Sequence, residues 1–206
     1  SIENGTVFIT NQDATRIIRL SPEEFLFSRT VLGEEYTIYC GEAQLIGAIG
    51  RACTDHPVGV YFLTGHGELT QEDCSLLALQ LRSNGFEVHS GEIARIAPAA
   101  TDILLLLAPR SDLTGDEAQT FAAFLDNGGR VLVACGADTP LSRLTQLQAV
   151  CSLYGLGFQS GWVVESDRYV DAPEYLSPVV AADYEITGRI LLPRASALMT
   201  PALRPG

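Results

Sequence analysis

The hydrophobic positions along the chain change repeatedly between two patterns, which predict helices and buried strands in turn. Leu45, Ala48, Ile49 and Ala52 recur at the spacing of one helix face, whereas residues 58–64 (VGVYFLT) form an apolar run of strand length. Repeated switching of this kind is typical of an α/β domain. The other predicted helices cover residues 70–84, 114–127 and 140–155, and the other predicted strands cover residues 86–89, 102–108, 130–135 and 158–164.

The link between the second and third predicted strands indicates the strand order. Residues 90–101 carry no helical stripe but are just long enough for a parallel crossover. This spacing suits a mostly parallel sheet in which the second strand lies outside the first and the third returns to its other side. In open sheets ligands bind at the carboxyl ends of the strands beside such a reversal. We therefore expect a functional surface where residues 65–68 meet residues 109–112.

Three regions are predicted along the chain. Residues 1–40 hold two β-like stretches and are expected to form an N-terminal β-rich arm. Residues 41–165 carry the alternating pattern and form the α/β core. Residues 166–206 contain five prolines, which interrupt regular structure, so we expect a segment that packs on the core with one strand at 189–192.

Charge and composition exclude several classes of function. The 206 residues include 25 acidic and 13 basic side chains, giving a formal charge of -12, and every basic residue is arginine. Without lysine there is no Walker A, Schiff-base or pyridoxal-phosphate lysine. The negative charge also argues against nucleic acid or an anionic membrane surface as a partner.

The apolar runs are too short to cross a membrane. The longest one covers residues 103–108, far below the roughly 18 residues that a span needs. The chain begins at Ser1 without a methionine or a leader-like segment, and we interpret it as a piece of a longer protein.

The cysteines and histidines show no metal-ligand spacing. There is no C-x-x-C motif, and the three histidines are scattered. We expect buried free thiols, and neither a metal nor another cofactor. The five cysteines are Cys40, Cys53, Cys74, Cys135 and Cys151.

The most specific local motif is Gly65-His66-Gly67-Glu68, directly after the strand at 58–64. Its glycines permit a sharp turn and a close approach of the backbone to a ligand or another chain. His66 and Glu68 could share a proton in catalysis or binding. The favoured interpretation is structural: a tight turn, with Glu68 near the positive end of the next helix.

The second loop contributes Arg110, Ser111 and Asp112 to the same predicted surface. Arg110 is the only basic residue there. It could bind an anionic ligand through a two-pronged contact, but a local ion pair with Glu68 or Asp112 is the favoured expectation.

Cys135 is the candidate nucleophile. It ends an apolar strand and precedes Gly136, as a residue on a strand-to-helix elbow does. A reactive thiol needs a base, which would have to be His66 or Glu68. Because no histidine follows His89, we favour an unreactive thiol.

Several stretches resemble the extracytoplasmic domain of GldG-like proteins, the gliding-motility type of auxiliary subunit in ABC transporters. The resemblance runs from about residue 41 to about residue 200. It rests on residues 41–49 (GEAQLIGAI), 60–68 (VYFLTGHGE), 102–104 (DIL), 108–114 (APRSDLT), 128–133 (GGRVLV), 153–156 (LYGL), 185–187 (EIT) and 192–195 (LPRA).

The resemblance implies a fold and a setting rather than a reaction. The implied fold is a three-layer α/β sandwich with a doubly wound sheet, like flavodoxin or the class I glutamine amidotransferases. The implied location is outside the cytoplasm, on a membrane-anchored protein whose membrane helices are absent from this fragment. Permease or other membrane subunits of the transport system are the implied partners.

The predicted function is therefore a non-catalytic binding or interaction module that uses Gly65, His66, Gly67, Glu68, Arg110, Ser111 and Asp112. One alternative is a thiol-dependent hydrolase or amidotransferase-like enzyme that uses Cys135 with His66 or Glu68. The other is a receptor domain for a small sugar or anion.

Overall fold

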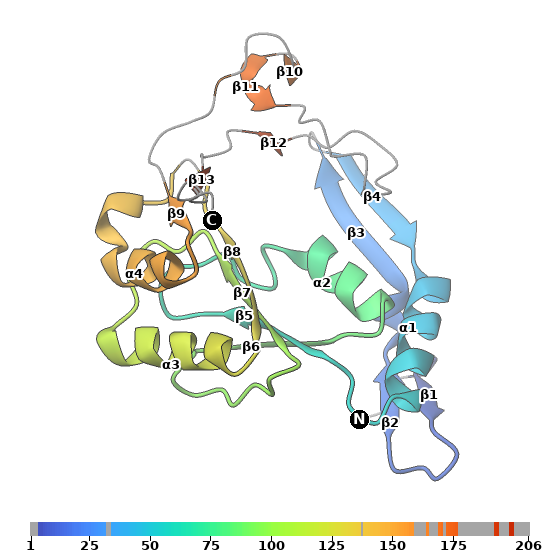
Figure 1. Cartoon of the computed structure of the whole chain (residues 1–206). Helices are drawn as coiled ribbons and strands as arrows, with labels where there is room; N and C mark the ends of the chain where they lie inside the picture. Colours follow the sequence, from blue (N-terminus) through green and yellow to red (C-terminus); the bar gives the residue numbers. More distant parts are fainter. Residues whose placement is uncertain are drawn as a thin grey trace, which may run out of the picture.

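Four parallel strands in the order β6-β5-β7-β8 form the central sheet of the computed structural model (Figure 1). They are β5 (Gly59–Leu63), β6 (Glu87–Gly91), β7 (Ile103–Leu107) and β8 (Arg130–Ala134). Val60 pairs with Val88 on one side and with Ile103 on the other. The predicted reversal of strand order beside β5 is confirmed.

The structure describes residues 4–31, 34–136, 138–158, 164, 169–170, 172–176, 192–193 and 198–199. The helices are α1 (Gly41–Cys53), α2 (Ser75–Ser83), α3 (Gly115–Asp126) and α4 (Thr145–Leu153), with 3-10 turns η1 (Pro22–Phe25) and η2 (Leu141–Arg143). The remaining strands are β1 (Val7–Thr10), β2 (Ile17–Leu20), β3 (Leu26–Val31), β4 (Glu34–Tyr39), β9 (Gly157–Phe158), β10 (Tyr169–Val170), β11 (Ala172–Leu176), β12 (Leu192–Pro193) and β13 (Leu198–Met199).

Strand β7 shows why the sheet is buried on both faces. Successive side chains of a strand point to opposite faces, and this strand is apolar throughout. Leu104 and Leu106 pack in a cluster with Phe121 of α3, whereas Leu105 and Leu107 pack in a second cluster that includes residues of α2. Figure 1 shows α3 and α4 on one side of the sheet and α2 on the other. The predicted α/β class is confirmed.

Helix boundaries follow local capping signals in one case and depart from them in two. Thr114 and Glu117 form the predicted capping box of α3, and Gly128 follows its end with a φ of +88°. The helix predicted from residue 70 begins only at Ser75, because the Thr70–Asp73 hydrogen bonds close a separate turn. The helix predicted over 140–155 is divided into η2 and α4.

The N-terminal region contains two β-hairpins, β1-β2 and β3-β4. The sequence predicts strands near β1 and β4, but it misses β2 and β3, whose short runs include charged or hydroxyl side chains. The strand predicted over 158–164 is present at Phe158, and residues 159–163 lie outside the described part. Most of the predicted C-terminal segment 166–206, including residues 189–191, also lies outside it. No helix in the described ranges is long and apolar enough to cross a membrane.

Helix α1 packs against α2 through Gly47. A Cβ atom on Gly47 would overlap the backbone carbonyl of Arg82, and the Arg51 guanidinium donates a hydrogen bond to the same carbonyl. Close approach of the two helices therefore requires glycine at this position.

We expect Gly47→Ala to lower the free energy of unfolding by about 1–3 kcal/mol, because the two helices must separate. Gly50→Ala, in the same helix, is the matched control. Its added methyl meets only the Gly85 Cα, at 4.0 Å, so it should stabilise the helix by up to about 1 kcal/mol. Urea unfolding of both variants measures the difference. Equal effects at the two positions would contradict the proposed helix contact.

Candidate functional site

The two loops predicted to meet are joined by their backbones. The His66 carbonyl accepts hydrogen bonds from the Arg110 amide at 2.8 Å and from the Ser111 amide at 3.0 Å. Gly65 and Gly67 have φ values of +119° and +72°, which L side chains rarely adopt. Residues 65–68 and 109–112, called the paired loops below, thus form one surface at the carboxyl ends of β5 and β7.

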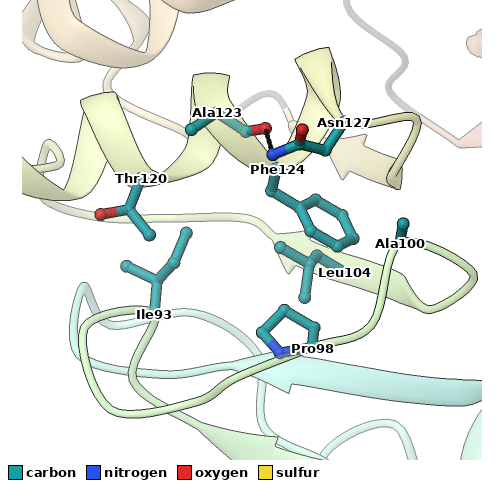
Figure 2. A pocket seen from close by; sticks show the side chains of 8 residues that line it. All are labelled: Ile93, Pro98, Ala100, Leu104, Thr120, Ala123, Phe124 and Asn127. Atoms are coloured by element: carbon teal, nitrogen blue, oxygen red, sulfur yellow. Dashed lines mark hydrogen bonds between the residues drawn. The ribbon is translucent and has the colours of Figure 1, made fainter.

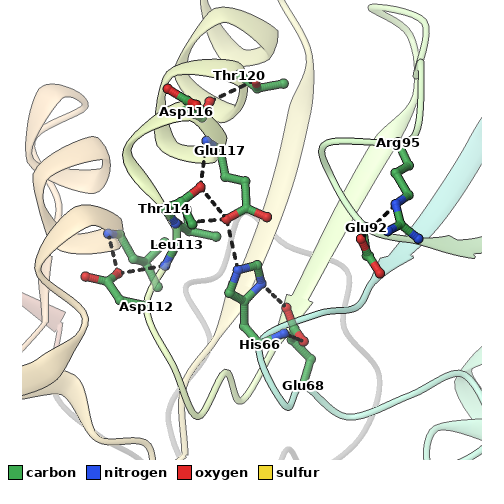
Figure 3. A network of polar contacts seen from close by, with 11 residues as sticks. His66, Glu68, Glu92, Arg95, Asp112, Leu113, Thr114, Asp116, Glu117 and Thr120 are labelled. Atoms are coloured by element: carbon green, nitrogen blue, oxygen red, sulfur yellow. Dashed lines mark hydrogen bonds and ion pairs between the residues drawn. The ribbon is translucent and has the colours of Figure 1, made fainter.

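The His66 side chain lies between two carboxylates (Figure 3). Its Nδ1 is 3.1 Å from Glu68 Oε1, and its Nε2 is 3.1 Å from Glu117 Oε2. The Glu68 Oε2 atom also accepts a hydrogen bond from the His66 amide at 2.7 Å. We call His66, Glu68 and Glu117 the histidine clamp; it links the β5–α2 loop to the first turn of α3.

The histidine clamp is buried and internally satisfied. The side chains of His66 and Glu68 are 9% and 1% exposed, and that of Glu117 is 15% exposed. Both ring nitrogens face carboxylate oxygens, so both can donate only when the ring is protonated. Hydrogen bonds from the Thr114 amide and hydroxyl, with a smaller contribution from His66, lower the pKa of Glu117. An imidazole held in this way positions loops and is not a free base.

Arg110 does not form the predicted ion pair. Glu68 is bound to His66, and Asp112 is bound to α4, so neither carboxylate is available. Arg110 is exposed, and it forms no ion pair within the described residues. The aliphatic part of its side chain lies against Gly67, where an added Cβ would be 3.1 Å from the Arg110 Cβ. The expectation of a local ion pair is wrong.

Asp112 caps the start of α4. Its carboxylate accepts hydrogen bonds from the amides of Gln146 at 2.8 Å and Leu147 at 3.1 Å, and from the Thr145 hydroxyl at 3.0 Å. Burial by itself raises the pKa of Asp112, but these bonds together with one from the Leu113 amide lower it overall. Within the predicted site, Asp112 therefore serves the fold, while Arg110 and Ser111 are exposed.

We expect Asp112→Asn to destabilise the protein by about 1 kcal/mol at neutral pH, because a charged cap on α4 is lost. A carboxyl whose pKa is lower in the folded state contributes stability above its unfolded pKa and loses it as pH falls through the folded value. The difference between the wild type and the variant should therefore shrink below about pH 4. Urea unfolding over a pH series checks this, with Asp116→Asn as an exposed carboxylate control. A difference independent of pH would contradict the role of the charge.

Cys135 lies at the end of β8, half-buried against the larger core cluster. Burial, together with nearby Cys151, raises its pKa to about 11. No hydrogen bond between described residues joins Cys135 to His66 or Glu68, and both ring nitrogens of His66 are engaged elsewhere. The described residues contain no group of acidic, cysteine and histidine side chains suited to a metal ion.

Glu117 is the functional residue that sequence reasoning misses. The Thr114–Glu117 spacing predicts its capping role, but the same oxygen also faces His66. The predicted strand order could have indicated this contact. It places the start of α3 at the same end of the sheet as the loop after β5.

Comparisons with known proteins show a likeness of fold only. No protein-family model matches the chain, and no curated protein matches it. It is similar to the solved structure of the mmIFT52 N-terminal domain, with a TM-score of 0.55 and 18% identity over 70% of this chain and 69% of that one. The TM-score supports a shared fold, and an identity this low gives no information about function.

Proposed function

We propose that the chain is a non-catalytic binding module that contacts a partner through the paired loops. One observation carries this proposal: both nitrogens of His66 are bound to carboxylates, while the neighbouring Arg110 remains exposed and unpaired among the described residues. The arrangement fixes the loop backbone and leaves a single cation to recognise a partner. It provides no nucleophile with a free base beside it.

The setting that we propose is the extracytoplasmic part of a membrane-anchored auxiliary protein of an ABC-type transport system. The support is the GldG-like resemblance of the motifs at residues 60–68 and 108–114. These motifs form the paired loops, so the resembling residues coincide with the proposed contact surface. A permease or another membrane subunit of the transporter is the proposed partner.

We further propose that the fold is a three-layer, doubly wound sandwich of the flavodoxin or class I glutamine amidotransferase type. Its support is the β6-β5-β7-β8 order and the two core clusters on opposite faces of the sheet. In such folds the reversal of strand order is the usual place for a site, and the paired loops lie there.

A site-specific photocrosslinker tests the contact in the full-length protein within its native membrane. Placed at the exposed position Ser111, it should cross-link to a transporter membrane subunit. Adding Arg110→Glu should abolish that product, because the cation becomes an anion. The control position is Arg130, an exposed residue at the amino end of β8, whereas the paired loops lie at the carboxyl ends of β5 and β7. No subunit cross-link from position 111, or equal cross-linking from both positions, would contradict the proposal.

A receptor for a small anion is a second candidate, and the unpaired Arg110 guanidinium favours it. Sulfate or phosphate should then raise the melting temperature of the wild type more than that of an Arg110→Ala variant. Equal increases in both proteins would exclude anion binding through Arg110.

A further inference from the structure

A cleft of about 520 Å³ lies between α3 and the connection from β6 to β7 (Figure 2). One wall is a single face of α3, with residues at the i, i+3, i+4 and i+7 positions of the helix. These are Thr120, Ala123, Phe124 and Asn127.

The opposite wall comes from the connection, through Ile93 and Pro98, and Leu104 of β7 lies between the walls. The cleft exists because residues 92–102 cross the sheet without forming a helix. A crossover helix would normally pack beside α3 at this place. Here the flank of α3 stays open, although Ile93 and Leu104 are buried beneath it.

The lining indicates an uncharged occupant. None of the lining side chains is ionisable, and most are aliphatic or aromatic. The lining also contains no cationic side chain that would hold an anion. The volume falls within the range of roughly 300–1,000 Å³ typical of small-molecule sites.

The two polar residues of the lining indicate which hydrogen-bonding group the occupant would present. The Thr120 hydroxyl donates to the Asp116 carbonyl, and the Asn127 side-chain amide donates to the Ala123 carbonyl, both at 2.9 Å. The hydroxyl proton is thereby used, which leaves Thr120 Oγ1 as an acceptor, while Asn127 keeps Oδ1 as an acceptor and one further N–H as a donor. A molecule with a hydroxyl or N–H group can donate to the two acceptor oxygens, Thr120 Oγ1 and Asn127 Oδ1.

We propose that this cleft binds a small neutral amphipathic molecule, with an apolar body against Phe124 and Leu104 and a hydrogen-bond donor toward the polar residues of α3. The site is separate from the paired loops. It lies beside the start of β7, whereas the paired loops follow the ends of β5 and β7. The proposal of ligand binding in this cleft can therefore be tested independently of the proposed partner contact.

Two fluorescent probes with the same aromatic body test the proposal. N-phenyl-1-naphthylamine is neutral and carries one N–H donor, whereas 8-anilinonaphthalene-1-sulfonate adds a negative charge. We expect saturable binding of about one neutral probe per chain, and affinity for the sulfonate at least about tenfold weaker.

Variants locate the binding. Ala123→Phe should fill the cleft from α3 and weaken the neutral probe at least about tenfold. Ala100→Phe fills it from the opposite wall and serves as an independent variant if the first does not fold, as judged by circular dichroism. Ala43→Phe, on the exposed side of α1, is the matched control and should leave binding unchanged. Equal binding of the two probes, or undiminished binding in a folded filling variant, would overturn the proposal.

Discussion

Replacing His66 with leucine should destabilise the protein by about 3 kcal/mol, because the carboxylates of Glu68 and Glu117 then lose the imidazole that they share. Most of this loss of stability arises at Glu68, because its side chain is 1% exposed and water cannot replace the lost hydrogen bond. For a chain of this length the loss corresponds to a fall in melting temperature of roughly 6–12 °C. Calorimetry or thermal circular dichroism measures it.

Two further variants separate the loss of these polar contacts from the loss of packing. His56→Leu makes the same substitution at an exposed histidine and should change stability by less than about 0.5 kcal/mol. Adding Glu68→Gln to His66→Leu removes the stranded charge and should restore part of the stability, so the two changes are not additive. Strict additivity, or a His66→Leu variant as stable as the wild type, would contradict the histidine clamp.

The second large effect concerns the reactivity of Cys135 toward iodoacetamide near neutral pH. With its pKa raised from 9.0 to about 11, the thiolate population is about a hundredfold lower than that of an unperturbed thiol. Burial against the core slows alkylation further. Mass spectrometry of the native protein should therefore find Cys53, which is exposed, modified long before Cys135.

The same experiment distinguishes a structural thiol from a catalytic one. Alkylation of Cys135 should accelerate as pH rises toward its pKa while the fold persists. A Cys135 that reacts near neutral pH as fast as Cys53, or faster, would identify an activated thiolate. The thiol-hydrolase alternative would then replace the non-catalytic proposal.

The central sheet could be predicted because its signals are local and strong. The leucine run of β7 has the composition of a strand buried on both faces, and the capping box at Thr114 fixes the start of α3. The short helix-free connection before β7 indicates the reversal of strand order. Together these features place residues 65–68 and 109–112 at one edge, and the hydrogen bonds of the His66 carbonyl confirm that the loops meet there.

The partners within the site could not be predicted, because they depend on competition between groups distant in sequence. Asp112 is only two residues from Arg110 in the sequence. Its carboxylate nevertheless accepts three hydrogen bonds from the start of α4 and forms no ion pair with Arg110. The His66–Glu68 contact is local and the sequence suggests it, but the contact of His66 with Glu117 joins residues that are 51 positions apart. Sequence patterns show that opposite charges lie nearby, but they do not show which donor each carboxylate will bind.

Amide hydrogen exchange at Arg110 and Ser111 tests the central claim most directly, because both residues are exposed while their amides donate to the His66 carbonyl. If the paired loops form one clamped surface, NMR will find both amides protected in the wild type and exchanging much faster in His66→Leu, with β7 amides still protected. Exchange of both amides at the rate of an open loop in the wild type would contradict the claim.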